Sequence, residues 1–200
     1  MAEDRAAAGR QARQRWNTRY QQTTTREIEP ARVLAENQHL LPTAGRALDL
    51  ACGRGGNAHL LAEHGLETSA WDISEVAVAQ VQNISQQDRL PLQAEVRDVS
   101  LHPPVPNSFD VIVVSRFLDR DLVPALIAAL KLNGLLFYQT FTRDASEADG
   151  PKNPAYLLAP QELLALFRPL RILCYREEGQ VGDMRRGLRY EARLVGQKVV

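Results

Sequence analysis

The fold of this 200-residue chain is decided by the segment Asp49-Leu50-Ala51-Cys52-Gly53-Arg54-Gly55-Gly56-Asn57-Ala58. It ends a short apolar run typical of a buried strand and opens a helical pattern over residues 57–64. Glycines at such a junction permit positive φ angles and let a ligand approach the backbone closely. The N–H groups at the start of the helix are free to face an electron-rich ligand. The segment therefore predicts a ligand-binding turn at the end of a strand.

The rest of the body alternates short apolar runs with helical patterns. Strands are expected over residues 47–51, 67–72, 92–96, 109–115 and 135–141, and further helices over 75–87, 121–131 and from Pro160. The apolar run at 109–115 is typical of a strand inside a parallel sheet. Two last strands, at about 170–176 and 188–195, have no room for a crossover helix between them, so we expect an antiparallel hairpin. The pattern predicts an α/β body of five β-α units plus a hairpin.

The amino-terminal segment has a different composition. Ala and Arg favour a helix over residues 4–20, which places Trp16 and Tyr20 on one face. Pro30 is suited to the first turn of a second helix, expected to run to about His39. The arginines of this segment form a local basic patch.

Composition and charge exclude several classes of protein. Lys and Arg number 24 and Asp and Glu number 24, so the net charge is zero, which argues against a nucleic-acid-binding domain. No apolar run is long enough to span a membrane, and the amino terminus lacks the apolar stretch of a secretory signal. The two cysteines cannot form a disulfide framework. We therefore expect a cytoplasmic protein without membrane or nucleic-acid partners.

Three acids follow successive strands: Asp49, Asp72 and Asp98. Gly53-x-Gly55-x-x-Ala58, with Asp72 as a ribose-binding acid, formally fits a dinucleotide-binding fingerprint. Two features argue against a dinucleotide-binding fold. A charge inside the strand end at Asp49 is costly unless it meets a polar ligand. The closing hairpin is not part of the six-parallel-strand order of that fold. Purely structural roles are the alternative for two of these acids, because Asp72 suits a strand-to-helix cap and Asp98 suits a turn.

With Asp49-x-Ala51-x-Gly53-x-Gly55 followed by these acids, residues 30–198 resemble the class I S-adenosylmethionine-dependent methyltransferases. The resemblance implies a three-layer Rossmann-like fold, with a seven-stranded, mostly parallel sheet that closes on an antiparallel hairpin strand. It implies that the glycine turn holds the methionine part of the cofactor, while Asp72 binds the ribose and Asp98 the adenine amino group. Ala51 replaces the usual glycine of the family. The cofactor-binding residues expected from the resemblance are Tyr20, Asp49, Ala51, Gly53, Gly55, Asn57, Asp72, Ile73, Asp98, Val99 and Ser115.

Several stretches resemble the tellurite-resistance (TehB-like) subgroup of these methyltransferases. They are Trp16-Asn17-x-Arg19-Tyr20, residues 115–122, residues 135–142, and Gly150-Pro151-x-Asn153-Pro154-x-Tyr156-Leu157-Leu158. Many relatives carry His where this chain has Asp119, so a polar role of that His toward the substrate is not carried over. Asp119 is expected to cap the following helix.

Methyl transfer to a soft or deprotonated nucleophile needs little acid–base machinery, because the sulfonium is a good leaving group and orientation alone contributes up to about 7–11 kcal/mol. Arg116, just after the fourth strand, is the expected catalytic group facing the acceptor; the plainer reading is an exposed arginine. No metal site is expected, since the four histidines lack ligand spacing. Cys52 is interpreted as a turn residue and Cys174 as a core residue.

The sequence thus predicts a lid over residues 1–41 and an S-adenosylmethionine-binding methyltransferase domain over 42–200. The alternative reading of the lid helix is that Trp16 and Tyr20 only pack it onto the body. The expected reaction methylates a small-molecule acceptor, such as a tellurite-like oxyanion or another soft nucleophile, and releases S-adenosylhomocysteine. The alternatives are an NAD-dependent oxidoreductase and a non-catalytic S-adenosylmethionine-binding module. Oligomeric state is left open by the sequence.

Overall fold

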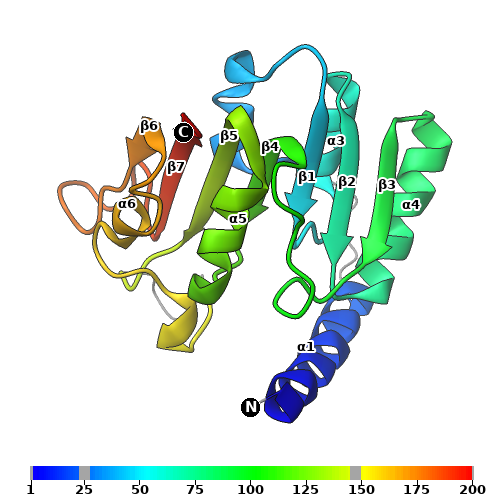
Figure 1. The fold of residues 1–200 in the computed structure, drawn as a ribbon. Helices are drawn as coiled ribbons and strands as arrows, with labels where there is room; N and C mark the ends of the chain where they lie inside the picture. Colours follow the sequence, from blue (N-terminus) through cyan, green and yellow to red (C-terminus); the bar gives the residue numbers. More distant parts are fainter. Residues whose placement is uncertain (1, 23–27, 145–149, 200) are drawn as a thin grey trace.

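Five parallel strands and an antiparallel pair form the central sheet (Figure 1). The computed structural model describes residues 2–22, 28–144 and 150–199. The strand order is β3-β2-β1-β4-β5-β7-β6, and β7 runs antiparallel to both of its neighbours. The strands are β1 (Arg46–Leu50), β2 (Glu67–Asp72), β3 (Leu92–Val96), β4 (Phe109–Ser115), β5 (Leu130–Phe141), β6 (Arg171–Arg176) and β7 (Glu191–Gln197). The predicted seven-stranded Rossmann-like fold with its antiparallel hairpin strand is confirmed.

Helices cover both faces of this sheet. The α-helices are α1 (Ala2–Gln22), α2 (Arg32–Ala35), α3 (Gly56–Glu63), α4 (Glu75–Asp88), α5 (Val123–Ala129) and α6 (Glu162–Leu166). Three 3-10 turns, η1 (Gln38–Leu40), η2 (Arg120–Leu122) and η3 (Pro154–Tyr156), lie between them. No helix among the described residues has the length and apolar character needed to cross a membrane.

The two faces of the central strands bury separate apolar clusters. Ile112 and Val114 face the cluster that α5 and α6 cover, whereas Val111 and Val113 face the cluster under α2 and α3. All four side chains are fully buried, as expected for a parallel strand covered on both sides. Each contributes roughly 1.5–3 kcal/mol of hydrophobic stabilisation. This double burial explains the continuous apolar run.

Several expected boundaries differ from the structure. The helix expected from Pro30 to His39 is shorter, because Asn37 has a φ of −120° and separates α2 from η1. The helix expected over 121–131 ends at Ala129, because the next residue, Leu130, already pairs with β4. The last strand begins at Glu191, after Tyr190 with its φ of +65°.

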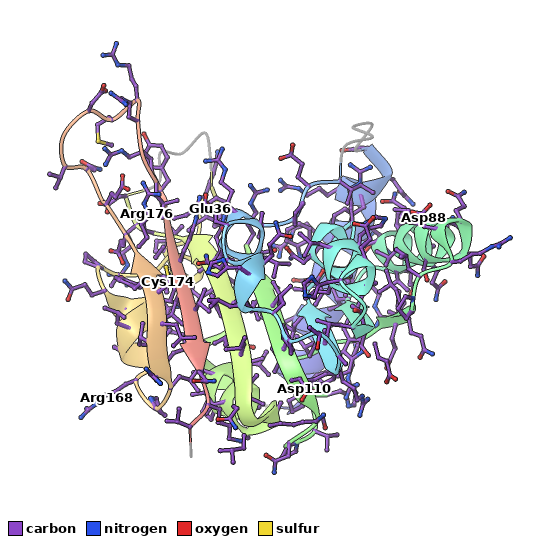
Figure 2. All side chains as sticks on the ribbon, turned by 90° about the horizontal axis from the view of Figure 1, so that it is seen from above. Glu36, Asp88, Asp110, Arg168, Cys174 and Arg176 are labelled. Carbon is purple, nitrogen blue, oxygen red and sulfur yellow. The ribbon has the colours of Figure 1, made fainter. Side chains whose placement is uncertain are left out.

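Two further predictions were wrong. The body does not contain five β-α units, because the connection from β3 to β4 has no helix; its three prolines cannot supply helical N–H groups. Cys174 is not in the core: it is exposed on β6, the edge strand of the sheet (Figure 2).

The carboxyl ends of the parallel strands share one edge of the sheet, which is the usual ligand-binding edge of open α/β folds. In Figure 1 this is the lower edge, and α1 lies beside it below β2 and β3. The glycine turn after β1 lies at this edge. The fold therefore brings α1 and the predicted ligand-binding turn together.

Candidate active site

The turn between β1 and α3 contains three left-handed residues. Ala51, Gly53 and Gly55 have φ angles of +55°, +53° and +82°, and Gly55 is the N-cap of α3. Successive N–H groups in such turns form a concave donor surface suited to an electron-rich ligand group. Ala51 thus adopts the conformation for which the family's usual glycine is suited, at a cost of about 1–2 kcal/mol.

Asp49 lies fully buried beneath this turn. Its Oδ1 accepts a hydrogen bond from Asn57 Nδ2 at 3.1 Å, and its Oδ2 accepts one from the Ala58 N–H at 3.1 Å. Burial raises the pKa of Asp49 from 3.8 to about 7, although both hydrogen bonds oppose the shift. A cationic ligand group near the turn would favour the ionised carboxylate.

Asn57 ties this carboxylate to two other parts of the chain. Its Nδ2 also lies 3.1 Å from Ser115 Oγ, which accepts a hydrogen bond, and its Oδ1 accepts one from the Ala31 N–H at 2.8 Å. The side chains of Asn57 and Ser115 are therefore bonded within the protein. Their predicted cofactor contacts remain predictions.

Asp72 ends β2 directly beside the glycine turn. Its Oδ2 accepts a hydrogen bond from the Gly53 N–H at 2.9 Å, and its Oδ1 accepts one from the Ser74 N–H at 2.8 Å. Ser74 Oγ in turn accepts from the Ala77 N–H and caps α4. Burial raises the pKa of Asp72 despite these bonds. Ser74 is therefore the N-cap of α4, and Asp72 supports it through the Ser74 N–H. Each carboxylate oxygen of Asp72 keeps acceptor capacity for a ligand hydroxyl.

Asp98 lies just beyond β3 and borders an open cleft. Its Oδ1 accepts a hydrogen bond from the Ser100 N–H at 3.2 Å, so it also acts as a turn residue. The neighbouring Val99 is buried in the core, and Ile73 is half-buried. A cleft of about 520 Å³ lies between α1 and this loop, with Asp98 and Arg10 in its lining.

Helix α1 spans the edge from β3 to β1. A Cβ on Gly9 would collide with the Asp98 carboxylate, so the helix backbone approaches this acid closely. Asn17 Oδ1 accepts a hydrogen bond from Ser74 Oγ at 2.7 Å. A Cβ on Gly53 would lie 2.9 Å from the Tyr20 hydroxyl oxygen. The helix therefore faces all three strand ends that carry the predicted cofactor residues.

Tyr20 enters the site from this helix, stacked on Trp16 with ring centroids 5.7 Å apart. Burial, and after it the charge of Asp72, raises the pKa of Tyr20 well above its usual range. The phenol therefore stays protonated and is available as a hydrogen-bond donor. Tyr20 packs against the glycine turn, with its hydroxyl oxygen close to Gly53.

Arg116 leaves β4 in a left-handed conformation, with φ of +53°. Its N–H donates to the Gln139 carbonyl at 2.8 Å, and its Nε lies 3.6 Å from Glu191 Oε1. Its side chain is 70% exposed beside Glu191 and is accessible from solvent. Asp119 accepts a hydrogen bond from the Asp121 N–H and caps η2, as expected.

Sequence reasoning missed the polar residues of β5 and β7. Gln139 Nε2 donates to Glu191 Oε2 at 2.6 Å, and Gln139 Oε1 accepts from the Val33 N–H at 2.9 Å. Buried Arg193 donates from Nη1 to both oxygens of Glu36, at 2.9 Å each; Figure 2 labels Glu36 beside α2. Charged residues inside an apolar strand pattern were the available signal. Their partners lie far away in the sequence.

Gly56 is another missed position. A Cβ there would collide with the carbonyl oxygen of Glu29, so the segment before α2 packs directly on the start of α3. This close approach places the Ala31 N–H within reach of Asn57. The third glycine of the turn therefore serves packing.

Two features of the described residues bear on the chemistry of the site. Burial raises the pKa of the Cys52 thiol well above its usual value, so it is not a thiolate nucleophile at neutral pH. No group of three or more His, Cys, Asp or Glu residues in the described part of the chain is placed to hold a metal ion. Two buried carboxylates beside a donor-rich turn suit a ligand that carries hydroxyl and cationic groups.

The family model described as "Tellurite resistance protein TehB" matches residues 11–190. The chain belongs to the TehB family. The predicted resemblance is confirmed by this match.

The individual curated relatives are distant in sequence. The probable S-adenosyl-L-methionine-dependent methyltransferase TehB of Haemophilus influenzae is 25% identical over 138 residues, which make up 66% of this chain and 48% of that protein. A ubiquinone biosynthesis O-methyltransferase of Coxiella burnetii is 25% identical over 134 residues, 64% of this chain and 57% of the relative. The chain thus spans about half the length of the curated relatives it matches.

The crystal structure of TehB from Haemophilus influenzae shares the fold, with a TM-score of 0.66 at 20% identity over 83% of this chain and 61% of that one. The Haemophilus influenzae relative is named a probable S-adenosyl-L-methionine-dependent methyltransferase and the Coxiella burnetii relative an O-methyltransferase, which is the class of enzyme that the sequence predicts. The antiparallel β7 departs from the six-parallel-strand dinucleotide order, which disfavours the oxidoreductase alternative.

Proposed function

We propose that this TehB-family protein transfers a methyl group from S-adenosylmethionine to a small-molecule acceptor. The observation that carries the proposal is the left-handed glycine turn flanked by the buried carboxylates of Asp49 and Asp72. Buried acids with raised pKa values mark sites that hold a polar ligand. S-adenosylmethionine would supply the methyl group on a cationic sulfonium.

Each part of the edge has a role in this proposal. The turn formed by Ala51, Gly53 and Gly55 would hold the methionine end of the cofactor, and Asp49 would balance its positive charge. Asp72 would accept from the ribose hydroxyls, while Asp98, which borders the cleft beside α1, would accept from the adenine amino group. Ile73, Val99, Asn57 and Ser115 would complete the surroundings of the cofactor.

Residues 1–41 would form a lid and residues 42–200 the methyltransferase domain. The contacts of α1 with Asp98, Ser74 and Gly53 support this division, because one helix covers the ends of three strands. Tyr20 would close the lid over the glycine turn and donate its hydroxyl proton to the bound cofactor.

Arg116 would face the acceptor from the opposite half of the edge. Its exposed guanidinium suits an acceptor that is already anionic, such as a tellurite-like oxyanion or a thiolate. Such a nucleophile needs no general base, so the site would act by holding donor and acceptor in line and by excluding water.

Cofactor binding is tested by titrating S-adenosylhomocysteine and NAD into the full chain in a calorimeter. We expect binding of S-adenosylhomocysteine alone, weakened about ten- to a hundredfold by Asp72→Ala, because hydrogen bonds to a charged acceptor are lost. The matched control is Asp88→Ala, which removes an exposed acid from α4 (Figure 2). Binding of NAD alone, or unchanged affinity in Asp72→Ala, would contradict the proposal.

Turnover is tested by release of S-adenosylhomocysteine with tellurite and with a small aromatic thiolate as acceptors. We expect release with at least one of them. Tight cofactor binding without turnover on any acceptor would instead favour the non-catalytic binding module.

A further inference from the structure

Arg120 links two loops that leave the carboxyl edge of the sheet. It is the first residue of η2, which follows β4, and it reaches the segment 153–162, which follows β5 in the chain. Its Nε donates to Glu162 Oε1 at 2.6 Å, and its Nη2 donates to Glu162 Oε2 at 3.0 Å. Its Nη1 donates to the Ala155 carbonyl at 2.6 Å, and Nη2 also donates to the Leu157 carbonyl at 3.0 Å. One guanidinium therefore holds a carboxylate and two backbone carbonyls of the same segment.

Glu162 fixes the other end of this arrangement. Its Oε2 also accepts a hydrogen bond from the Ala159 N–H at 2.7 Å. The hydrogen bond from Arg120 lowers the pKa of Glu162, so the carboxylate remains charged at neutral pH. A planar fork facing a carboxylate gives directional as well as electrostatic restraint, which a lysine ammonium cannot reproduce.

The segment held in this way presents an aromatic side chain. At its base, the Leu158 N–H donates to the Phe141 carbonyl at the end of β5, and Leu158 is fully buried. At its start, Asn153 Oδ1 accepts from the Ala155 N–H. Tyr156 stands between these anchors with 43% of its surface exposed. The strand holds the base of the segment, and Arg120 holds the carbonyls on both sides of Tyr156.

This segment lies near Arg116 in the chain's fold and away from the glycine turn that is proposed to bind the cofactor. Arg120 begins η2 directly after the short loop that carries Arg116, the residue proposed to face the acceptor. In Figure 1 the yellow segment that contains η3 lies below the lower end of β5 and beside α5, while α1 lies below β2 and β3. The two halves of the edge therefore carry different sets of side chains.

We propose that Arg120 is a positioning residue for the acceptor, because it holds the Tyr156 turn as one wall of the acceptor site beside Arg116. The proposal rests on the methyl-transfer function proposed above. It predicts that loosening Arg120 changes the acceptor KM and leaves cofactor affinity unchanged.

Arg120→Lys tests this proposal, with Glu162→Gln as a second variant that removes the charge but keeps an acceptor oxygen. The matched control is Arg185→Lys, which alters a 90% exposed arginine paired with its near neighbour Asp183. The first readout is trypsin cleavage of the folded protein after Lys152, located by mass spectrometry. We expect at least tenfold faster cleavage in Arg120→Lys and Glu162→Gln, and an unchanged rate in the control.

The second readout separates acceptor from cofactor. With tellurite or an aromatic thiolate as acceptor, we expect Arg120→Lys to raise the acceptor KM at least fivefold. We expect kcat at saturating acceptor, and the Kd of S-adenosylhomocysteine, to stay within twofold of the wild type. A merely structural role would move cofactor affinity and kcat together with KM.

Two results would overturn the proposal: unchanged cleavage after Lys152, or faster cleavage with an unchanged acceptor KM. A wild-type protein that binds S-adenosylhomocysteine but turns over neither probe would contradict the proposed function instead. The cleavage comparison would still decide whether Arg120 holds the turn.

Discussion

The buried carboxylate of Asp49 makes the stability of the protein depend on pH in a defined direction. Burial raises the pKa of Asp49 from 3.8 to about 7. Between these two values the native state binds more protons than the unfolded state, so the free energy of unfolding falls as pH rises and levels off above pH 7. A shift of about three pKa units, at 1.36 kcal/mol per unit, lowers the free energy of unfolding by about 4 kcal/mol once Asp49 is ionised in both states.

Asp49→Asn removes this titration. The amide oxygen of Asn can accept from only one of the two donors, Asn57 and the Ala58 N–H, so the variant loses about 1–3 kcal/mol at every pH. Between pH 5 and pH 8, the free energy of unfolding of the wild type should nevertheless fall by about 2–3 kcal/mol relative to that of the variant. Taking the difference between the two proteins cancels the titration of all other groups.

The assay is urea unfolding of both proteins at pH 5, 6, 7 and 8, with comparison of unfolding free energies at equal m-values. The difference should change steadily up to pH 7 and then flatten. A difference that is constant across this range would refute the reasoning, because it would mean that Asp49 titrates well below pH 5.

Three further predictions concern single side chains at the same edge. Ala51→Gly should raise the free energy of unfolding by about 0.5–1 kcal/mol, since relief of the left-handed strain exceeds the added entropy of the unfolded chain; a lower urea midpoint would contradict this. Tyr20→Phe should weaken S-adenosylhomocysteine binding three- to tenfold in calorimetry with little change in Tm, whereas an unchanged Kd would leave Tyr20 a packing residue. Glu191→Gln should lower the KM for tellurite about fivefold by removing the negative charge beside Arg116, and a raised KM would show that the pair positions Arg116 for the acceptor.

Local spacing was sufficient to predict that the glycine turn, Asp49 and Asp72 lie together at one edge of the sheet. Asp49 and the glycines lie within one strand-turn-helix unit, and Asp72 ends the next strand, so their order in the chain already places them at one edge. The strand positions were predicted well because buried parallel strands have continuous apolar runs. The helix ends were predicted poorly, because single residues such as Asn37 decide them.

The polar contacts of β5 and β7 were not predictable in the same way. Val33 and Gln139 are 106 positions apart, and Glu36 and Arg193 are 157 apart, so no local pattern connects them. Gln139 reaches Val33 from β5, and Arg193 reaches Glu36 from β7. The position of β7 between β5 and β6 was not evident from the hairpin pattern alone.

The sequence by itself determined the α/β class, the glycine turn and the order of the acids, because these depend on local periodicity and on the shared edge of parallel strands. Only the tertiary structure decided that α1 spans that edge and that Arg120 holds the Tyr156 turn. Those contacts depend on which distant segments pack together, and packing is set by the whole apolar core rather than by neighbouring residues.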